Sequence, residues 1–125
     1  TAYAARGALL AADFYIRGRN YEKAAEELNW LAARGSDFPE LVPVAKLRLA
    51  SVYADQKKFD DALAQLNNPP APFKALYDDR KGDVLVAQGK KAEAVAAWKA
   101  ALGDQQLPPA FVNTIQLKIS ALGGE

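Results

Sequence analysis

Hydrophobic residues recur at three- and four-residue intervals along the whole chain, and glycine, asparagine and proline interrupt the pattern. The spacing predicts a first helix over 2–17, which Gly18 and Asn20 separate from a second helical stretch ending near Gly35. Because the break between the two stretches is short, we expect them to pack against each other as a helical hairpin.

Two further hairpins and one single helix follow in the pattern. The hairpins are predicted over about 39–67 and 73–102, with the proline-rich run NNPPAP as the stop between them. A last helix is predicted over about 108–122, where it would cover the open side of the third hairpin. The spacing therefore predicts seven helices.

Two prolines and one glycine affect the helices that this pattern predicts. Pro39 suits the first turn of the third helix, but Pro43 removes a backbone donor, so we expect either a late helix start or a distorted first turn there. Gly82 lies inside the fifth helix, where glycine costs about 1 kcal/mol relative to alanine. We expect another element to approach closely at Gly82.

One outline occurs three times, as RNYEKAAEEL, KKFDDALAQL and GKKAEAVAAW. Aligned at Ala24, Ala62 and Ala94, the copies are 38 residues (24 to 62) and 32 residues (62 to 94) apart, which brackets the roughly 34-residue period of tetratricopeptide repeats. Small residues in register would let helix axes approach and successive hairpins stack. Three more columns align, namely Ala12, Ala50 and Gly82; Tyr15, Tyr53 and Leu85; and Leu28, Leu66 and Trp98.

We therefore predict an all-α fold, a tetratricopeptide-like right-handed solenoid of three helical hairpins plus a C-terminal capping helix, as a single domain over residues 1–125. In this register Lys91 departs from the aromatic residues Tyr21 and Phe59 of the first two copies. Trp98 falls in an aligned column of large residues, which favours a place in the core over a role in ligand binding.

Composition narrows the classes of function. Sixteen basic and fifteen acidic residues are spread along the chain and leave a net charge of +1, which argues against a nucleic-acid-binding face. The chain has no histidine and no cysteine, which removes the usual general base, thiol chemistry and the commonest metal ligands. We predict a protein that is not an enzyme, with no cofactor, no metal site and no small-molecule substrate.

Carboxylate chemistry, as in a glycoside hydrolase, is the enzymatic alternative. It would need two acids in one cleft, so it depends on whether a carboxyl pair faces a deep pocket. Asp78, Asp79 and Asp83 lie close together, but they lack the spacing of a calcium-binding loop, and solvated charges are the favoured interpretation.

The stretch DDRKGDVLVAQGKKAEA at 78–94, together with YEKAAEELNWL, AKLRLASVYADQKKFDDALAQL and PPAFVNTIQLKISAL, resembles the soluble domain of the YfgM-like ancillary subunits of the bacterial Sec translocon. The resemblance implies a location on the periplasmic face of the bacterial inner membrane, an N-terminal membrane anchor upstream of this chain, and two partners, the translocon and a membrane-anchored periplasmic chaperone. The alternative is a generic tetratricopeptide adaptor of another cell-envelope assembly complex.

In stacked hairpins the first helix of each pair lines the concave side, so its outward residues are the candidates for partner binding. Arg6 and Arg17 would bind carboxylates, and Asp79 and Asp83 would bind basic groups. A solvated face without a partner is the alternative for each position. The complete set is Arg6, Leu9, Asp13, Ile16, Arg17, Leu47, Ser51, Asp55, Asp79, Asp83 and Val86.

Trp30 lies beside the apolar stripe of the second helix rather than on it. We expect it to be partly exposed and a candidate anchor for a partner, with burial against the following loop as the alternative.

Overall fold

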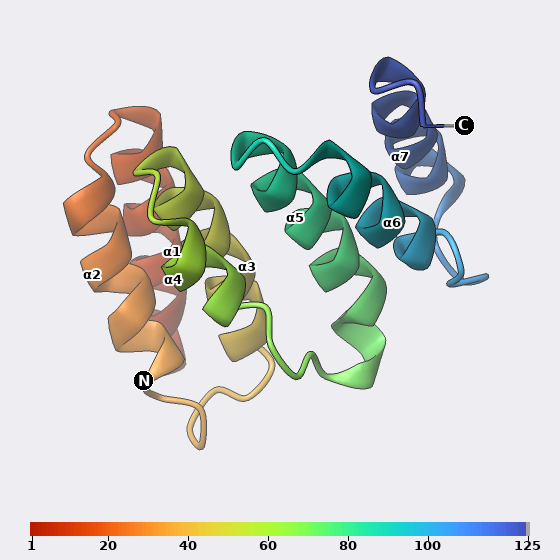
Figure 1. Cartoon of the computed structure of the whole chain (residues 1–125). Coiled ribbons are helices and arrows are strands. Elements are labelled where there is room, and N and C mark those ends of the chain that lie inside the picture. Colours follow the sequence, from red (N-terminus) through yellow and green to blue (C-terminus); the bar gives the residue numbers. More distant parts are fainter. Residues whose placement is uncertain (125) are drawn as a thin grey trace. The chain divides into compact units, whose positions relative to one another are not determined.

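The computed structural model describes residues 1–124, which form seven α-helices, one short 3₁₀ helix and no strand (Figure 1). The all-α prediction is confirmed, and all seven predicted helices are present. In chain order the elements are α1 (Ala2–Arg17), α2 (Tyr21–Ala32), α3 (Val42–Asp55), α4 (Phe59–Ala64), η1 (Ala71–Phe73), α5 (Lys74–Ala87), α6 (Lys91–Ala101) and α7 (Pro109–Ala121).

The chain packs as two compact units, and the boundary falls between Asn67 and Asn68, within the NNPPAP run. Two consecutive prolines prevent either neighbouring helix from continuing through this run. The first unit contains two helical hairpins, and the second contains one hairpin and α7. The single domain over residues 1–125 stays a prediction.

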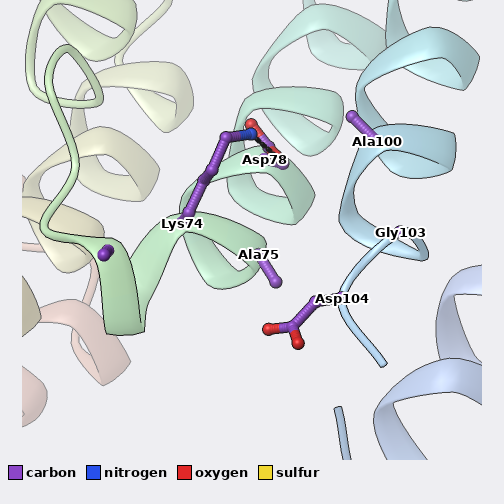
Figure 2. A pocket seen from close by; sticks show the side chains of 7 residues that line it. Lys74, Ala75, Asp78, Ala100, Gly103 and Asp104 are labelled. Carbon is purple, nitrogen blue, oxygen red and sulfur yellow. Dashed lines mark hydrogen bonds and ion pairs between the residues drawn. The ribbon is translucent and has the colours of Figure 1, made fainter. Parts of the chain in front are cut away.

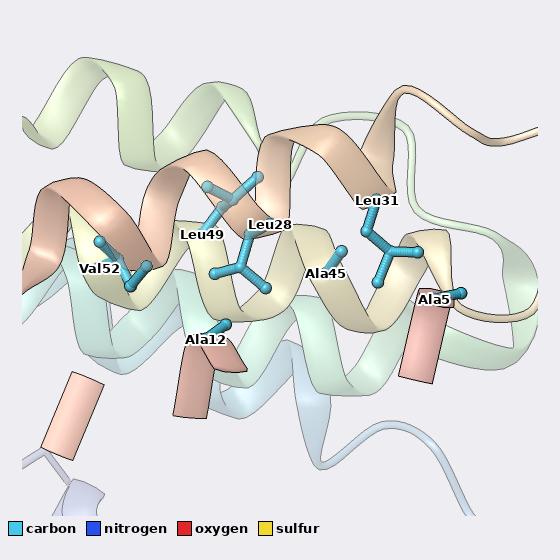
Figure 3. Packing of buried hydrophobic residues seen from close by; sticks show 8 residues of the cluster. Ala5, Ala12, Leu28, Leu31, Ala45, Leu49 and Val52 are labelled. Atoms are coloured by element: carbon cyan, nitrogen blue, oxygen red, sulfur yellow. The ribbon is translucent and has the colours of Figure 1, made fainter. Parts of the chain in front are cut away.

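In the first unit each helix packs on the next, α1 on α2, α2 on α3 and α3 on α4. Their small and branched side chains form one core, seen in Figure 3, in which every residue is at most 1% exposed. Across the α2–α3 contact the Asn29 side-chain amide also donates a hydrogen bond to the Tyr53 hydroxyl at 3.0 Å. The core residues are Ala5, Ala12, Ala24, Leu28, Leu31, Ala45, Leu49 and Val52.

In the second unit α5 packs along α6, and α7 packs on α6 at the far end of the chain. Ala75, Trp98 and Ala101 share a core there with Ile115 and Ile119 of α7. The apolar side of α7 thus covers the hairpin, as expected of a capping helix. Trp98 is buried, so its predicted place in the core is confirmed.

The start of α3 agrees with the late helix start that was expected at Pro43. The helix begins at Val42, so Pro43 lies in its first turn, where the missing backbone N–H would have no helical partner in any case. The late start is therefore confirmed. The placement of Pro39 in a first helical turn is wrong, because Pro39 lies in the turn segment that precedes α3.

The repeat register appears in the backbone of the three hairpin turns. Arg19, Lys57 and Gly89 each lie five residues before an aligned alanine, and they take positive φ angles of 59°, 62° and 86°. After each of them the next backbone N–H donates a 2.8 Å hydrogen bond back to the aligned large residue, Tyr15, Tyr53 or Leu85. The three aligned alanines are fully buried. The three hairpins therefore turn in the same way.

The expected close approach at Gly82 is confirmed. A Cβ atom added to Gly82 would lie 2.7 Å from Cε2 of Trp98 and closer still to Cδ1 and Nε1 of the same ring. The indole N–H donates a hydrogen bond to the Asp79 carbonyl oxygen at 3.1 Å, which fixes the ring against α5. Only glycine leaves room for the ring at this position of α5.

We expect Gly82→Ala to lower the free energy of unfolding by about 2 kcal/mol, because the new methyl group overlaps the Trp98 ring. Gly7→Ala is the matched control in α1, where an added Cβ meets nothing within 4 Å. It should raise the free energy of unfolding by roughly 0.5–1 kcal/mol through helix propensity alone. Urea unfolding followed by circular dichroism measures both changes, and changes of the same sign would contradict the packing at Gly82.

The turn geometry predicts a second pair of effects. Lys57→Gly should raise the free energy of unfolding by about 1 kcal/mol, and Gly89→Ala should lower it by about 1 kcal/mol, because side chains are strained at positive φ. Gly18→Ala is the control, since Gly18 has a φ of −82° and an added Cβ would have only ordinary contacts at 3.7 Å. Thermal unfolding distinguishes them, and equal losses for Gly18→Ala and Gly89→Ala would refute the shared turn.

Candidate partner-binding surfaces

α1 carries five of the residues predicted to bind a partner, and they are not equivalent in the structure. Arg6 and Arg17 are exposed, so both guanidinium groups are accessible to a partner. Leu9 and Ile16 are half-buried and pack against the core of the first unit. The face of α1 that was expected to be concave therefore combines exposed basic groups with apolar side chains that partly support the core.

An ion pair links α1 to α3 on the same side. Arg48 Nε lies 3.2 Å from Asp13 Oδ1, with both side chains one-third exposed. Of the α3 candidates, Asp55 is exposed and Ser51 is half-buried. Asp13 thus has an intramolecular partner that the sequence did not reveal.

Leu47 is buried, with 8% of its surface exposed, so we correct its assignment as an outward partner-binding residue. The reason lies in the position of α3. Six of its fourteen residues are buried, so its apolar side chains are covered on more than one side. Helical periodicity alone does not reveal a second buried face.

The two acidic candidates of α5 hold a basic group of the same chain. Lys118 Nζ of α7 donates hydrogen bonds to Asp83 Oδ1 at 2.8 Å and to Asp79 Oδ1 at 3.0 Å. The ammonium group also lies 5.8 Å from the centroid of the Trp98 ring. The sequence correctly indicated that these carboxylates would attract a basic group, but it did not identify Lys118 as that group.

Burial and charge act on Lys118 in opposite directions. Burial lowers the pKa of its ammonium group, whereas the hydrogen bonds that it donates to Asp83 and Asp79 and their negative charges raise it, and the net result is a raised pKa. Lys118 therefore keeps its proton, and its bonds to both carboxylates, at physiological pH. Val86, the remaining candidate on α5, is half-buried against the core of this unit.

Trp30 has the partial exposure that was expected, with 37% of its surface exposed. The Arg34 guanidinium lies 4.7 Å from the centroid of its ring, a cation–π contact that holds the indole in place. The ring borders a hollow of about 360 Å³ between α1 and α2, whose charged lining is acidic. The lining residues are Ala4, Ala8, Glu26, Glu27 and Trp30.

Three large apolar residues of α1 are exposed to solvent, and none of them was among the predicted site residues. Tyr3, Leu10 and Phe14 are 92%, 72% and 71% exposed. Beside them lies a hollow of about 300 Å³ that is lined by Ala2, Tyr3, Arg6, Gly7 and Leu10. The signal was present in the sequence, because α1 has two apolar faces and a single buried contact uses only one of them.

A hollow of about 390 Å³ in the second unit bears on the carboxylate alternative (Figure 2). Asp78 and Asp104 both line it, but each has a structural partner. Lys74 Nζ lies 2.7 Å from Asp78 Oδ2, and Asp104 Oδ1 accepts the backbone N–H of Gln106 at 2.9 Å. These contacts explain both acids without chemistry on a substrate. Among residues 1–124 no cluster of three acidic side chains is arranged to hold a metal ion.

The model of the tetratricopeptide repeat-like domain family matches residues 1–124. The chain belongs to this family. No solved structure matches it. Within residues 1–124, no helix combines the length and the apolar character that crossing a bilayer requires.

Similar curated proteins share one name. An ancillary SecYEG translocon subunit of Neisseria gonorrhoeae is 33% identical over 120 residues, which is 95% of this chain and 57% of that protein. The protein of the same name from Escherichia coli is 33% identical over 121 residues, 96% of this chain and 58% of its own length. A Buchnera aphidicola relative, also so named, is 28% identical over 98 residues. The chain thus spans under three-fifths of the first two relatives.

The Lys118 contacts predict a pH-dependent contribution to stability. Lys118→Met keeps the apolar stem and removes the charge, and it should lower the free energy of unfolding by about 1–2 kcal/mol at neutral pH. Because the folded-state pKa is raised above the ordinary value of 10.5, the contribution is fully present below pH 10.5. It is lost as pH rises through the raised pKa, so the difference between the variant and the parent chain should shrink there.

Lys74→Met is the matched control for that comparison. Lys74 also pairs with an aspartate, but its side chain is 64% exposed against 28% for Lys118. The loss should stay below about 0.5 kcal/mol. Two results in urea unfolding would show that the Lys118 charge stabilises the fold no more than an exposed ion pair does. One is an equal loss for the two variants, and the other is a loss for Lys118→Met that persists unchanged above the raised pKa.

Proposed function

We propose that this chain is a non-catalytic protein-interaction domain associated with the bacterial Sec translocon. The observation that carries the proposal is the 33% identity to two ancillary SecYEG translocon subunits over 95% and 96% of this chain. The similarity covers the hairpins and α7 together, so the interaction surfaces lie within the shared part. Because the chain spans only 57% and 58% of those relatives, the proposal concerns the domain rather than the whole protein.

The chemistry of the surface supports a scaffold rather than an enzyme. The chain has no histidine or cysteine, and the two carboxylates at the 390 Å³ hollow of the second unit are engaged by Lys74 and by the Gln106 backbone. Asp79 and Asp83 are engaged by Lys118. What the first unit exposes instead is apolar surface beside charged groups, the usual composition of a site for polypeptides.

The domain links the translocon to a periplasmic chaperone at the periplasmic face of the inner membrane. A linking domain needs two surfaces, and the first unit has two that differ in charge. The exposed face of α1 carries Arg6 and Arg17, whereas the hollow at Trp30 carries Glu26 and Glu27. Opposite charges would keep one partner from competing for the site of the other.

The test is photo-crosslinking in the intact protein in its bacterial host. A photoreactive residue at Arg17 or Asp55, both exposed on the first unit, should capture translocon components, and one at Trp30 should capture a periplasmic chaperone. The control position is Glu93, which is exposed in the first turn of α6 and belongs to the second unit. If Arg17, Asp55 and Trp30 capture neither translocon components nor a periplasmic chaperone, the proposal is rejected. Capture of other envelope assembly proteins would favour a generic adaptor.

A further inference from the structure

The exposed apolar residues of α1 form one continuous face of that helix. Tyr3, Gly7, Leu10 and Phe14 are three or four residues apart, so they lie on adjacent turns of one side, here called the α1 stripe. Gly7 has open space above it, and together with Tyr3 and Leu10 it lines the hollow of about 300 Å³. The ring of Phe14 is supported edge-on by Tyr15, with centroids 5.7 Å apart. The stripe is therefore a shaped surface with room for an inserted side chain.

The repeat register shows what such a face is built to do. Moving 38 residues along the chain places Gly7 on Ala45 and Phe14 on Val52. Ala45 is 0% and Val52 1% exposed, and both share a core with Leu28 and Leu31 of the preceding helix α2. On α3 this face is covered by a stacked helix. The same shift places Leu10 on Arg48, whose side chain is one-third exposed, so Gly7 and Phe14 carry the correspondence. The α1 stripe therefore overlaps the equivalent face of the first hairpin, and in the described chain it has no helix upon it.

The helix that covers the α3 face indicates the chemistry of an occupant. α2 is amphipathic, with its leucines in the core and with Glu22, Glu26 and Glu27 on its outer sides. The α1 stripe is bordered by Arg6 and Arg17, which are exposed, while Asp13, the one acid of α1, is paired with Arg48. An acidic partner helix would complement this edge.

A second copy of the chain fits the α1 stripe less well. Arg6 and Arg17 flank the same side of the stripe, so two α1 helices packed face to face and antiparallel would bring the arginines of one copy beside those of the other. Like charges opposed across an apolar contact disfavour the pairing. Charge thus disfavours the antiparallel dimer, whereas it would attract an acidic foreign helix.

We propose that the α1 stripe binds an amphipathic α-helix of another protein, which carries acidic residues beside its apolar face and inserts one large apolar side chain into the hollow at Gly7. The helix lies on α1 as α2 lies on α3. This inference goes beyond the proposed function, because it concerns a defined surface and holds whether or not the partner belongs to the translocon.

The test uses two synthetic helical peptides of about 18 residues, a length at which helix formation in water becomes adequate. Both carry the same leucine stripe, flanked by glutamate in one peptide and by lysine in the other. Fluorescence anisotropy should show at least tenfold tighter binding of the glutamate peptide. Arg6→Gln combined with Arg17→Gln should reduce that preference to less than threefold.

Substitution of the stripe itself completes the test. Leu10→Gln combined with Phe14→Gln should weaken binding of the glutamate peptide at least tenfold, whereas Leu117→Gln on α7, which is also 71% exposed in the parent chain, should leave it unchanged. Both replaced side chains are exposed, and circular dichroism checks that the helix content is kept. Equal binding of the two peptides, or equal binding by the stripe variant and the parent chain, would overturn the proposal.

Two further measurements exclude other occupants. Sedimentation velocity should show a monomer over the concentrations of the titration, and a dimer that Leu10→Gln and Phe14→Gln abolish would identify a second copy instead.

Leu10→Cys should react with a maleimide in the intact native polypeptide as fast as Leu117→Cys does. Protection of Leu10→Cys in the absence of any partner would show that the same polypeptide covers the stripe, and would overturn the proposal. None of these assays contains a translocon, so their failure leaves the proposed function untouched.

Discussion

The close approach of helices at small residues is the constraint on which this structure depends. At Gly82 the missing side chain lets the Trp98 ring lie directly against α5, where its N–H reaches the Asp79 carbonyl oxygen. Lys118 in turn lies over that ring and binds the Asp79 and Asp83 carboxylates. A larger residue at position 82 would move the ring and, with it, the platform under Lys118. One small residue therefore positions both the core of the second unit and the charge contact of α7.

The first unit uses the same principle without glycine. Ala5, Ala12, Ala24 and Ala45 are fully buried where α1, α2 and α3 pack, and leucine and valine fill the space between these helices. Alanine suits this role because it has the highest helix propensity and adds little bulk. The three hairpin turns then reverse the chain through the same positive-φ position and the same backbone hydrogen bond. Local backbone geometry and small side chains together produce the repeated hairpin.

Local features of the sequence were sufficient to predict the helices, the turns and the repeat register. Gly18 and Asn20, the NNPPAP run and the aligned alanines each act on their own neighbourhood, so one chain without relatives reveals them. Apart from Pro39, which lies in a turn rather than in the first turn of α3, the failures concern long-range contacts. Leu47 and Leu9 have similar periodicity, yet Leu47 is buried and Leu9 half-buried, because α3 has covered faces that α1 lacks. Lys118 likewise lies 35 residues from Asp83, and no local pattern connects them.

The acidic pair Asp79 and Asp83 on α5 differs from the α1 stripe in the contacts that it already makes within the chain. A partner with a basic group would have to displace Lys118 from Asp79 and Asp83, and the cost of breaking two charge-assisted hydrogen bonds would be subtracted from its affinity. A partner at the α1 stripe would displace only water from Tyr3, Leu10 and Phe14. Arg6 and Arg17 are exposed on the same side of α1 and need not leave another protein group. The face that stacks hairpins inside the chain is thus also the face that would bind a partner helix with the smallest loss of existing contacts.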